Sequence, residues 1–147
     1  MKKVILLSIC SVLMVFASDI TIQEPYVRAT PPNLPNSAAF MRLKNSSNKN
    51  IAVVNATSNV SKVVELHTHD MKDGVLKMYK IPKIDIPANG ETVLKPGGLH
   101  IMFIGLYNPL VKGEKVTFTL EFSNGETKTI TAPIKTVMGG MKHRGAK

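Results

Sequence analysis

The sequence predicts an all-β protein, an antiparallel β-sandwich or barrel with Greek-key connections. Short runs rich in Val, Ile, Thr and Phe recur about every ten residues along the chain. Turn-forming dipeptides separate several of these runs, and no segment of ten or more residues keeps a helical period. Evenly spaced short strands of this kind are typical of sandwiches and barrels.

Five strands are expected in the first part of the chain. Residues 20–23 alternate between apolar and polar side chains, and residues 38–44 form a largely apolar run. Residues 51–54 are apolar and mostly β-branched, residues 63–66 lead into a histidine, and residues 75–81 carry a methionine at their centre. Branched and aromatic residues favour the pleated conformation in each case.

Four more strands are expected in the second part. Residues 92–94 and 101–106 are short apolar runs, and residues 128–132 combine threonine and isoleucine. Residues 116–122 alternate strictly, which predicts one buried and one solvated face. Tight turns are expected at three dipeptides, Asp73-Gly74, Asn89-Gly90 and Asn124-Gly125.

The N-terminus has the pattern of a secretory signal. Lys2 and Lys3 precede an uncharged run over residues 4–16, which is short for a membrane-spanning helix. We expect cleavage after Ala17 or Ser18, export to the periplasm, and no stable membrane insertion afterwards. A retained membrane anchor is the alternative.

The expected organisation has three parts: a signal over residues 1–18, one domain over residues 19–136, and a basic tail over residues 137–147. The single cysteine, Cys10, lies in the signal, and Ile9 before it disfavours lipidation there. The mature chain then has neither a disulfide nor a thiolate metal site. Imidazoles and thioethers remain as metal ligands in an oxidising compartment.

The formal net charge is +9, and it falls to +7 when Lys2 and Lys3 are removed. The lysines are scattered singly, without an arginine cluster, an aromatic ladder or a nucleic-acid-binding motif. We therefore expect a solvated basic surface that favours an acidic partner, and no binding to nucleic acid.

The most informative pair is His100 and Met102, in the apolar run after Pro96-Gly97-Gly98. Side chains two apart on a strand share a face, so an imidazole and a thioether converge. Thioether sulfur is a soft ligand that favours Cu(I). A lone Met on a strand is usually core filler, but His67 and Met78 lie in the same 36-residue stretch, and the grouping predicts a copper site.

The turn at Asp73-Gly74 decides which histidine pairs with Met78. A two-residue turn places Met78 opposite His69, whereas a turn one residue longer moves the pairing toward His67. The residues alone leave both pairings open.

Ten residues separate His67 from Met78, 21 separate Met78 from His100, and one separates His100 from Met102. This spacing resembles the H-x10-M-x21-H-x-M signature of the periplasmic copper chaperones called PCuAC. The likeness extends over roughly residues 20–133. The neighbouring segments that also resemble the family are Tyr26-Val27-Arg28, Ser37-Ala38-Ala39-Phe40-Met41, Val64-Glu65-Leu66, Gly74-Val75-Leu76-Lys77, Pro96-Gly97-Gly98-Leu99 and Gly113-Glu114-Lys115-Val116-Thr117-Phe118.

The resemblance implies a cupredoxin-like β-sandwich with an exposed Cu(I) site formed by His67, Met78, His100 and Met102. It implies a carrier, not an enzyme, that delivers copper toward cytochrome c oxidase assembly, notably the CuA centre. The partner would be the copper subunit of the oxidase or another assembly chaperone. Some family members carry a Met directly after the first His, where this chain has Thr68.

Further thioethers and imidazoles are auxiliary candidates. His69 and Met71 follow the first ligand on the same run. The tail adds Met138, Met141 and His143, which would form a second site for Cu(I) or Cu(II).

Other classes explain less of the sequence. A blue-copper electron carrier needs a cysteine thiolate, and a hydrolase would show a nucleophile elbow or an H-E-x-x-H helix. A non-metal adhesion sandwich explains the strands but not the spaced ligands. A copper buffer for tolerance, in place of a donor, stays open.

Overall fold

A computed structural model describes residues 17–137 of the chain and shows ten strands and no helix among them. The strands are β1 (Ile20–Arg28), β2 (Asn36–Asn45), β3 (Ile51–Ser58), β4 (Ser61–Lys72), β5 (Val75–Lys80), β6 (Ile84–Ile86), β7 (Glu91–Leu94), β8 (His100–Leu106), β9 (Lys115–Phe122) and β10 (Thr127–Lys135). The all-β prediction is confirmed. The predicted cleavage site lies at the edge of the described region. Residues 1–16 of the predicted signal and residues 138–147 of the predicted tail lie outside it.

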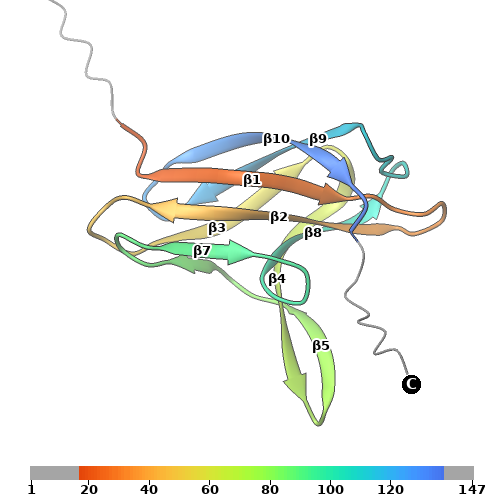
Figure 1. Cartoon of the computed structure of the whole chain (residues 1–147), viewed down its shortest axis with the longest axis horizontal. Helices are drawn as coiled ribbons and strands as arrows, with labels where there is room; N and C mark the ends of the chain where they lie inside the picture. The colour runs from red at the N-terminus through yellow and green to blue at the C-terminus, as the bar shows by residue number, and fades with distance from the viewer. Residues whose placement is uncertain (1–16, 138–147) are drawn as a thin grey trace, which may run out of the picture.

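The strands form two layers. One layer has the order β5-β4-β8-β2-β1, with β7 also paired to β2, and the other has the order β10-β9-β3-β6. Figure 1 shows the two layers stacked, with the β4–β5 hairpin extending away from the sandwich. The hairpin thus places part of one sheet beyond the core.

One pairing departs from the predicted antiparallel arrangement. The strands β1 and β10 run parallel where Val27 pairs with Ile134 and Arg28 with Lys135, and this short contact joins the layers. A parallel pair needs a long connection between its strands. Here almost the whole domain lies between the two strands, so a local sequence pattern gives no sign of the pairing.

The core lies between the layers and follows the predicted alternation of β9. Val116, Phe118, Leu120 and Phe122 are all buried. Phe118 meets Phe103 of β8 edge-on, with 5.7 Å between ring centroids. Each buried aromatic side chain contributes about 2–3 kcal/mol through the area that it removes from water.

Every segment expected as a strand overlaps an observed one, and β6 is the strand that was not predicted. It has only three residues, Ile84–Ile86, and prolines at positions 82 and 87 flank it. An alternation cannot be recognised over three residues, because a single repeat of it occurs by chance.

A loop separates β7 from β8, and both of these strands pair with β2. Met41 of β2 pairs with Leu94 of β7, and Ala39 of β2 pairs with Ile101 of β8. Residues 95–100 therefore connect two pairs that are only one residue of β2 apart. The Lys95 amide donates to the Leu99 carbonyl at 3.0 Å and closes the loop. Its tight course uses Gly97 at a φ of 80°, which favours glycine.

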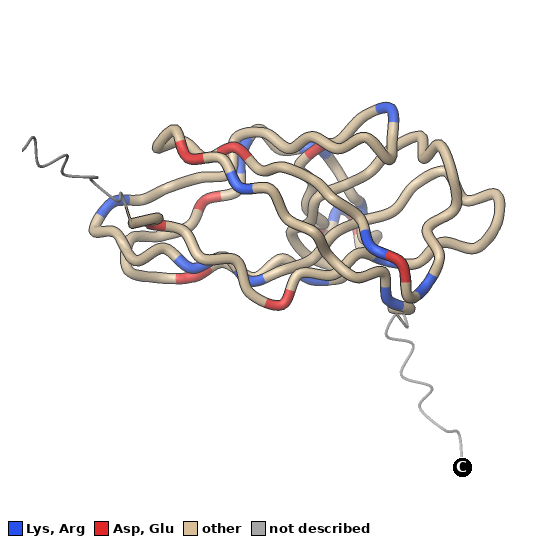
Figure 2. Tube along the Cα trace, turned by 90° about the horizontal axis from the view of Figure 1, so that it is seen from above, with Lys and Arg blue, Asp and Glu red and all other residues tan. Residues whose placement is uncertain are grey.

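Charges of both signs are interspersed over the described trace, as Figure 2 shows. This distribution agrees with a solvated surface and not with a continuous basic stripe. Between Ala17 and Val137, no helix has the length and apolarity to cross a bilayer.

Candidate metal centre

The candidate ligands lie on one face of the sheet formed by β5, β4 and β8. His67 pairs with His100, and Glu65 pairs with Met102. The alternating neighbours Leu66 and Ile101 are buried in the core. Because side chains alternate across a strand, the histidines and Met102 lie on the opposite, outer face.

The β4–β5 turn settles the pairing that the sequence left open. Lys72 pairs with Val75, so the turn has two residues, Asp73 and Gly74, with φ of 54° and 75°. Positive φ at both positions is the geometry of a type I′ hairpin turn. Met78 therefore pairs with His69, and His67 pairs with Lys80.

The imidazole of His100 is 2% exposed and carries its proton on the side away from Met78. Its Nδ1 lies 2.9 Å from the Gly98 carbonyl oxygen, which can only accept, so Nδ1–H donates. Burial lowers the pKa of His100, which favours the neutral ring with a lone pair on Nε2.

The His100 Nε2 atom lies 3.1 Å from the Met78 sulfur. Metal bonds of about 2.0 Å to nitrogen and about 2.3 Å to sulfur leave two ligand atoms roughly 3–4 Å apart. The nitrogen and sulfur are thus already placed at the separation that a shared ion requires.

His67 is held by a carboxylate. Its Nε2–H donates to Glu65 at 2.7 Å, and Lys80 lies 3.3 Å from the same carboxylate. Hydrogen bonds from His67, the larger cause, and from Lys80 hold the pKa of Glu65 below its usual value. A carboxylate on one imidazole nitrogen typically orients the other toward a metal.

The second nitrogen of His67, Nδ1, is buried and has no hydrogen-bond partner among the described residues. Buried polar atoms are nearly always paired, so an unpaired one needs an explanation. In the neutral ring this atom holds a lone pair, and a bound cation would satisfy it. The donor chemistry therefore fits a metal ion.

A cavity of about 260 Å³ opens beside these residues. Its lining includes Met78, His100 and Met102 together with His69 and Arg28, whereas His67 does not line it. Met78 is 43% exposed as well as lining the cavity, so solvent reaches this residue.

The imidazoles are spaced as ligands of one ion would be. The ring centroids of His67 and His100 are 5.7 Å apart, and those of His69 and His100 are 5.1 Å apart. Metal–nitrogen bonds of about 2.0 Å place two ring centroids roughly 4.5–6 Å apart. Both distances fall in this range.

Within residues 17–137, no three His, Cys, Asp or Glu side chains are gathered so as to hold a metal. The sulfur atoms of Met78 and Met102 are the further donor atoms beside this cavity, and thioether sulfur favours a soft cation.

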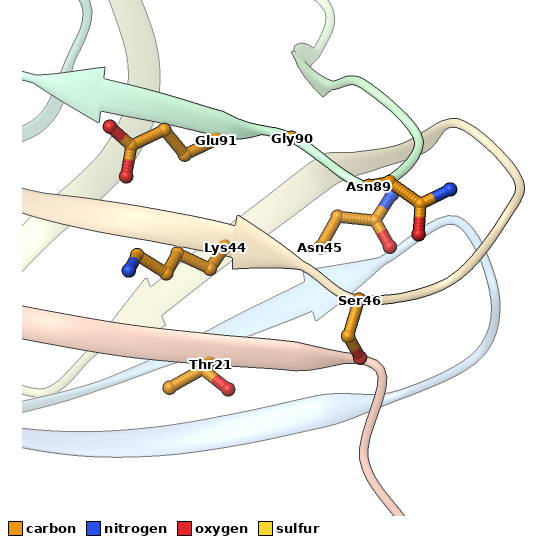
Figure 3. Close-up of a pocket in the computed structure, with 7 residues that line it drawn as sticks. All are labelled: Thr21, Lys44, Asn45, Ser46, Asn89, Gly90 and Glu91. Carbon is orange, nitrogen blue, oxygen red and sulfur yellow. The ribbon is translucent and has the colours of Figure 1, made fainter.

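The remaining candidates are Met71 and three residues of the tail. Met71 is 61% exposed and does not line the cavity, while Met138, Met141 and His143 lie outside the described residues. Another hollow, shown in Figure 3, has neither an imidazole nor a thioether among its lining residues and gives no support to a metal site. Its lining residues are Thr21, Lys44, Asn45, Ser46, Asn89, Gly90 and Glu91.

Sequence reasoning did not give Glu65 or the Gly98 carbonyl a role. Glu65 stands two residues before His67, and the strand period would have placed it on the same face. The carbonyl carries no such signal, because a backbone group is the same at every residue.

The chain resembles solved structures of one class of copper-binding domain. It is 34% identical to apo-DR1885 from Deinococcus radiodurans, with a TM-score of 0.64, covering 83% of this chain and 82% of that one. The CuI-DR1885 structure gives 33% identity, a TM-score of 0.67, and coverage of 86% and 85%. The copper-bound PCuAC domain from PmoF2 shares the fold at 20% identity, with a TM-score of 0.70 and coverage of 83% and 97%.

Fold and sequence thus define a PCuAC-type β-sandwich domain, and the predicted resemblance is confirmed. Residues 20–134 match the family described as "Putative lipoprotein LpqE-like", and the chain belongs to this family. A relative from Leifsonia xyli subsp. xyli, named a lipoprotein, is 35% identical over 84% of this chain and 74% of its own length. An uncharacterised protein of Rickettsia prowazekii is 30% identical over 76% of this chain and 64% of its own.

Proposed function

We propose that this protein is a copper chaperone that binds Cu(I) through His67, Met78, His100 and Met102. The observation that carries the proposal is the 3.1 Å approach of the His100 Nε2 atom to the Met78 sulfur. Structures of relatives named as copper-bound and CuI-bound support copper as the ion. Imidazole and thioether ligands are neutral and suit Cu(I). Because they do not compensate the positive charge of the ion, they help the release of copper to an acceptor.

Transfer needs an ion that an acceptor can reach. Met78 is 43% exposed on a hairpin that extends from the sandwich (Figure 1), whereas His100 is almost fully buried. An acceptor can therefore replace the thioether first while the imidazole still holds the ion. This order of exchange supports a carrier and not an enzyme.

The acceptor that we propose belongs to cytochrome c oxidase assembly, either the copper subunit of the oxidase or another assembly chaperone. Support comes from the resemblance of the H-x10-M-x21-H-x-M spacing to the chaperone family. Deletion of the gene should lower oxidase activity in copper-limited cells and leave it normal in copper-replete cells. Sensitivity to excess copper with normal oxidase activity would instead identify a copper buffer.

We propose that the chaperone works in the periplasm. The lysine-led apolar N-terminus and the lipoprotein names of its relatives support export. The intact mass of the exported protein should correspond to cleavage after Ala17 or Ser18. A mass that retains residues 4–16 would instead show a membrane anchor, and a lipid on Cys10 would show a lipoprotein.

The ligand assignment is tested by substitution. We expect His100→Ala and Met102→Leu each to weaken Cu(I) binding at least tenfold, about 1.4 kcal/mol or more, because each removes a donor atom from the ion. The measurement is a competition titration against a chromophoric Cu(I) chelator under reducing, anaerobic conditions.

The matched control is Met41→Leu, which replaces a methionine buried in the core by a side chain of similar volume. Its Cu(I) affinity should equal that of the parent protein. If the His100 and Met102 variants also bind as tightly as the parent, the proposed site is wrong. X-ray absorption of the Cu(I)-loaded protein should show both sulfur and nitrogen, and a shell without sulfur would contradict the proposal.

A further inference from the structure

His69 lies in the cavity, yet the ligand set implied by the family spacing does not include it. It lines the cavity together with Met78, His100 and Met102. The two-residue turn also places it directly opposite Met78 on the neighbouring strand. Three of the four proposed ligands therefore share the cavity with His69 and not with His67.

The orientation of His69 matches that of His100. Its Nδ1 lies 3.3 Å from the Gly98 carbonyl oxygen, the same atom that accepts from His100 Nδ1 at 2.9 Å. Because a carbonyl only accepts, both rings direct Nδ1–H toward it and keep their Nε2 lone pairs free. A backbone carbonyl on one ring nitrogen is a typical support for a metal-binding histidine.

The distance between the rings also fits. The centroids of His69 and His100 are 5.1 Å apart, within the roughly 4.5–6 Å expected for two imidazoles on one ion. The spacing of His67 and His100, 5.7 Å, fits the same range. Each of the two β4 histidines is therefore close enough to share an ion with His100.

The two histidines differ in what holds them. The Nε2–H of His67 is bound to Glu65 at 2.7 Å, and its unpaired Nδ1 is buried. His69 is half-buried and lies at the cavity. An ion that enters through the cavity therefore meets His69 before it meets His67.

We infer that His69 is a copper ligand of this protein that alternates with His67 as the second imidazole beside His100. The inference rests on the proposed function and extends it. His69 is the imidazole that an ion meets at the cavity, and His67 is the imidazole that binds the ion further inside. Exchange of one imidazole for the other lets the ion move while His100 stays bound. The same exchange in reverse brings the ion back to the exposed Met78 for release.

A double-mutant cycle tests the alternation. Glutamine replaces each histidine in the full chain, giving His67→Gln, His69→Gln and the double variant, and Cu(I) affinity is measured by competition with a chromophoric chelator. If the imidazoles substitute for one another, each single variant weakens binding by about tenfold or less. The double variant then weakens binding by more than the product of the single effects, because no second imidazole remains.

X-ray absorption supplies an independent measurement. In Cu(I)-loaded His67→Gln we expect two nitrogen atoms around copper, and in the double variant only one. The control is Thr68→Val, which changes the residue between the two histidines and should leave affinity and nitrogen count unchanged. All variants are repeated with His143→Ala, so that no nitrogen comes from the tail.

Two results would overturn the inference. In one, His69→Gln changes neither affinity nor nitrogen count when His67 is already replaced. In the other, His69→Gln alone is as damaging as the double variant, so that His67 does not serve as the alternative imidazole. Failure of the proposed function looks different, because His100→Ala and Met102→Leu would then also bind Cu(I) like the parent. Unfolding midpoints close to that of the parent show that each variant is folded.

Discussion

His100 illustrates how individual groups prepare the site. Its ring is buried, its Nδ1 is bound to the Gly98 carbonyl, and burial is the main cause of its lowered pKa. Burial outweighs the hydrogen bond to the Gly98 carbonyl, which by itself raises the pKa, so the neutral ring is favoured. The carbonyl holds the proton on Nδ1 and leaves the Nε2 lone pair free, which is the form that binds a metal. The position of His100 in the spacing was evident from the sequence, but its protonation and orientation depend on groups that packing brings to it.

The lowered pKa of His100 predicts how stability depends on pH. As the pH falls below about 6.5, the unfolded chain takes up a proton at His100 while the folded, metal-free protein does not. The unfolded state then binds more protons, so the contribution of this residue to stability is complete above about pH 6.5 and declines below it. Urea unfolding of the metal-free protein at pH 7.5 and pH 5.5 measures the decline.

The comparison variant is His100→Gln, which has no group that titrates in this window. We expect its free energy of unfolding to fall less between the two pH values than that of the parent. Glu65 and the other titrating groups are present in both proteins, so their contribution cancels. An equal decline in the two proteins would contradict the burial effect at His100.

At the scale of elements, the β4–β5 hairpin decides which side chains meet. A two-residue turn pairs His69 with Met78, and this register depends on positive φ at Asp73 and Gly74. A slip of one residue would send the side chains of one strand to the opposite face. The Asp-Gly dipeptide was recognisable as a turn, whereas its length was set only by the backbone conformation.

Gly74→Ala tests the contribution of this turn. A Cβ at Gly74 meets nothing within 4 Å, so the cost is that of a positive φ for alanine, about 1 kcal/mol of stability. We expect Cu(I) affinity to fall several-fold as well, because strain in the turn loosens the position of Met78. Denaturant unfolding and chelator competition measure the two effects.

Gly125→Ala is the matched control. Gly125 lies between β9 and β10 with a φ of 88°, and a Cβ there also meets nothing within 4 Å. It should lose similar stability while binding Cu(I) like the parent. Equal Cu(I) affinities in the two variants would show that the β4–β5 turn does not position the ligand.

At the scale of the whole molecule, one sheet of the sandwich carries the candidate site. All four proposed ligands and His69 come from β5, β4 and β8, which are neighbouring strands at one edge of a single sheet. The rigid core behind that sheet, including Phe103 and Phe118, keeps the strands in register. The tail residues Met138, Met141 and His143 lie outside the described part of the chain.

Deletion of residues 138–147 separates the two candidate sites. We expect the shortened protein to keep its unfolding midpoint and one Cu(I) ion with the affinity of the parent, because every ligand on the sheet remains. Any second ion that the full chain binds should be lost. Copper analysis after equilibrium dialysis gives the number of bound ions, and loss of the first ion on deletion would place one of its ligands in the tail.

The sequence by itself determined the fold class, nearly all the strands, and the spacing of the candidate ligands. Each of these depends on short-range patterns, namely the two-residue period of strands and the chemistry of individual side chains. Tertiary structure decided that β1 pairs in parallel with β10, that Met78 faces His69, and that the Gly98 carbonyl also meets His69. These features depend on backbone turns and on contacts between distant segments, for which a local pattern carries no signal.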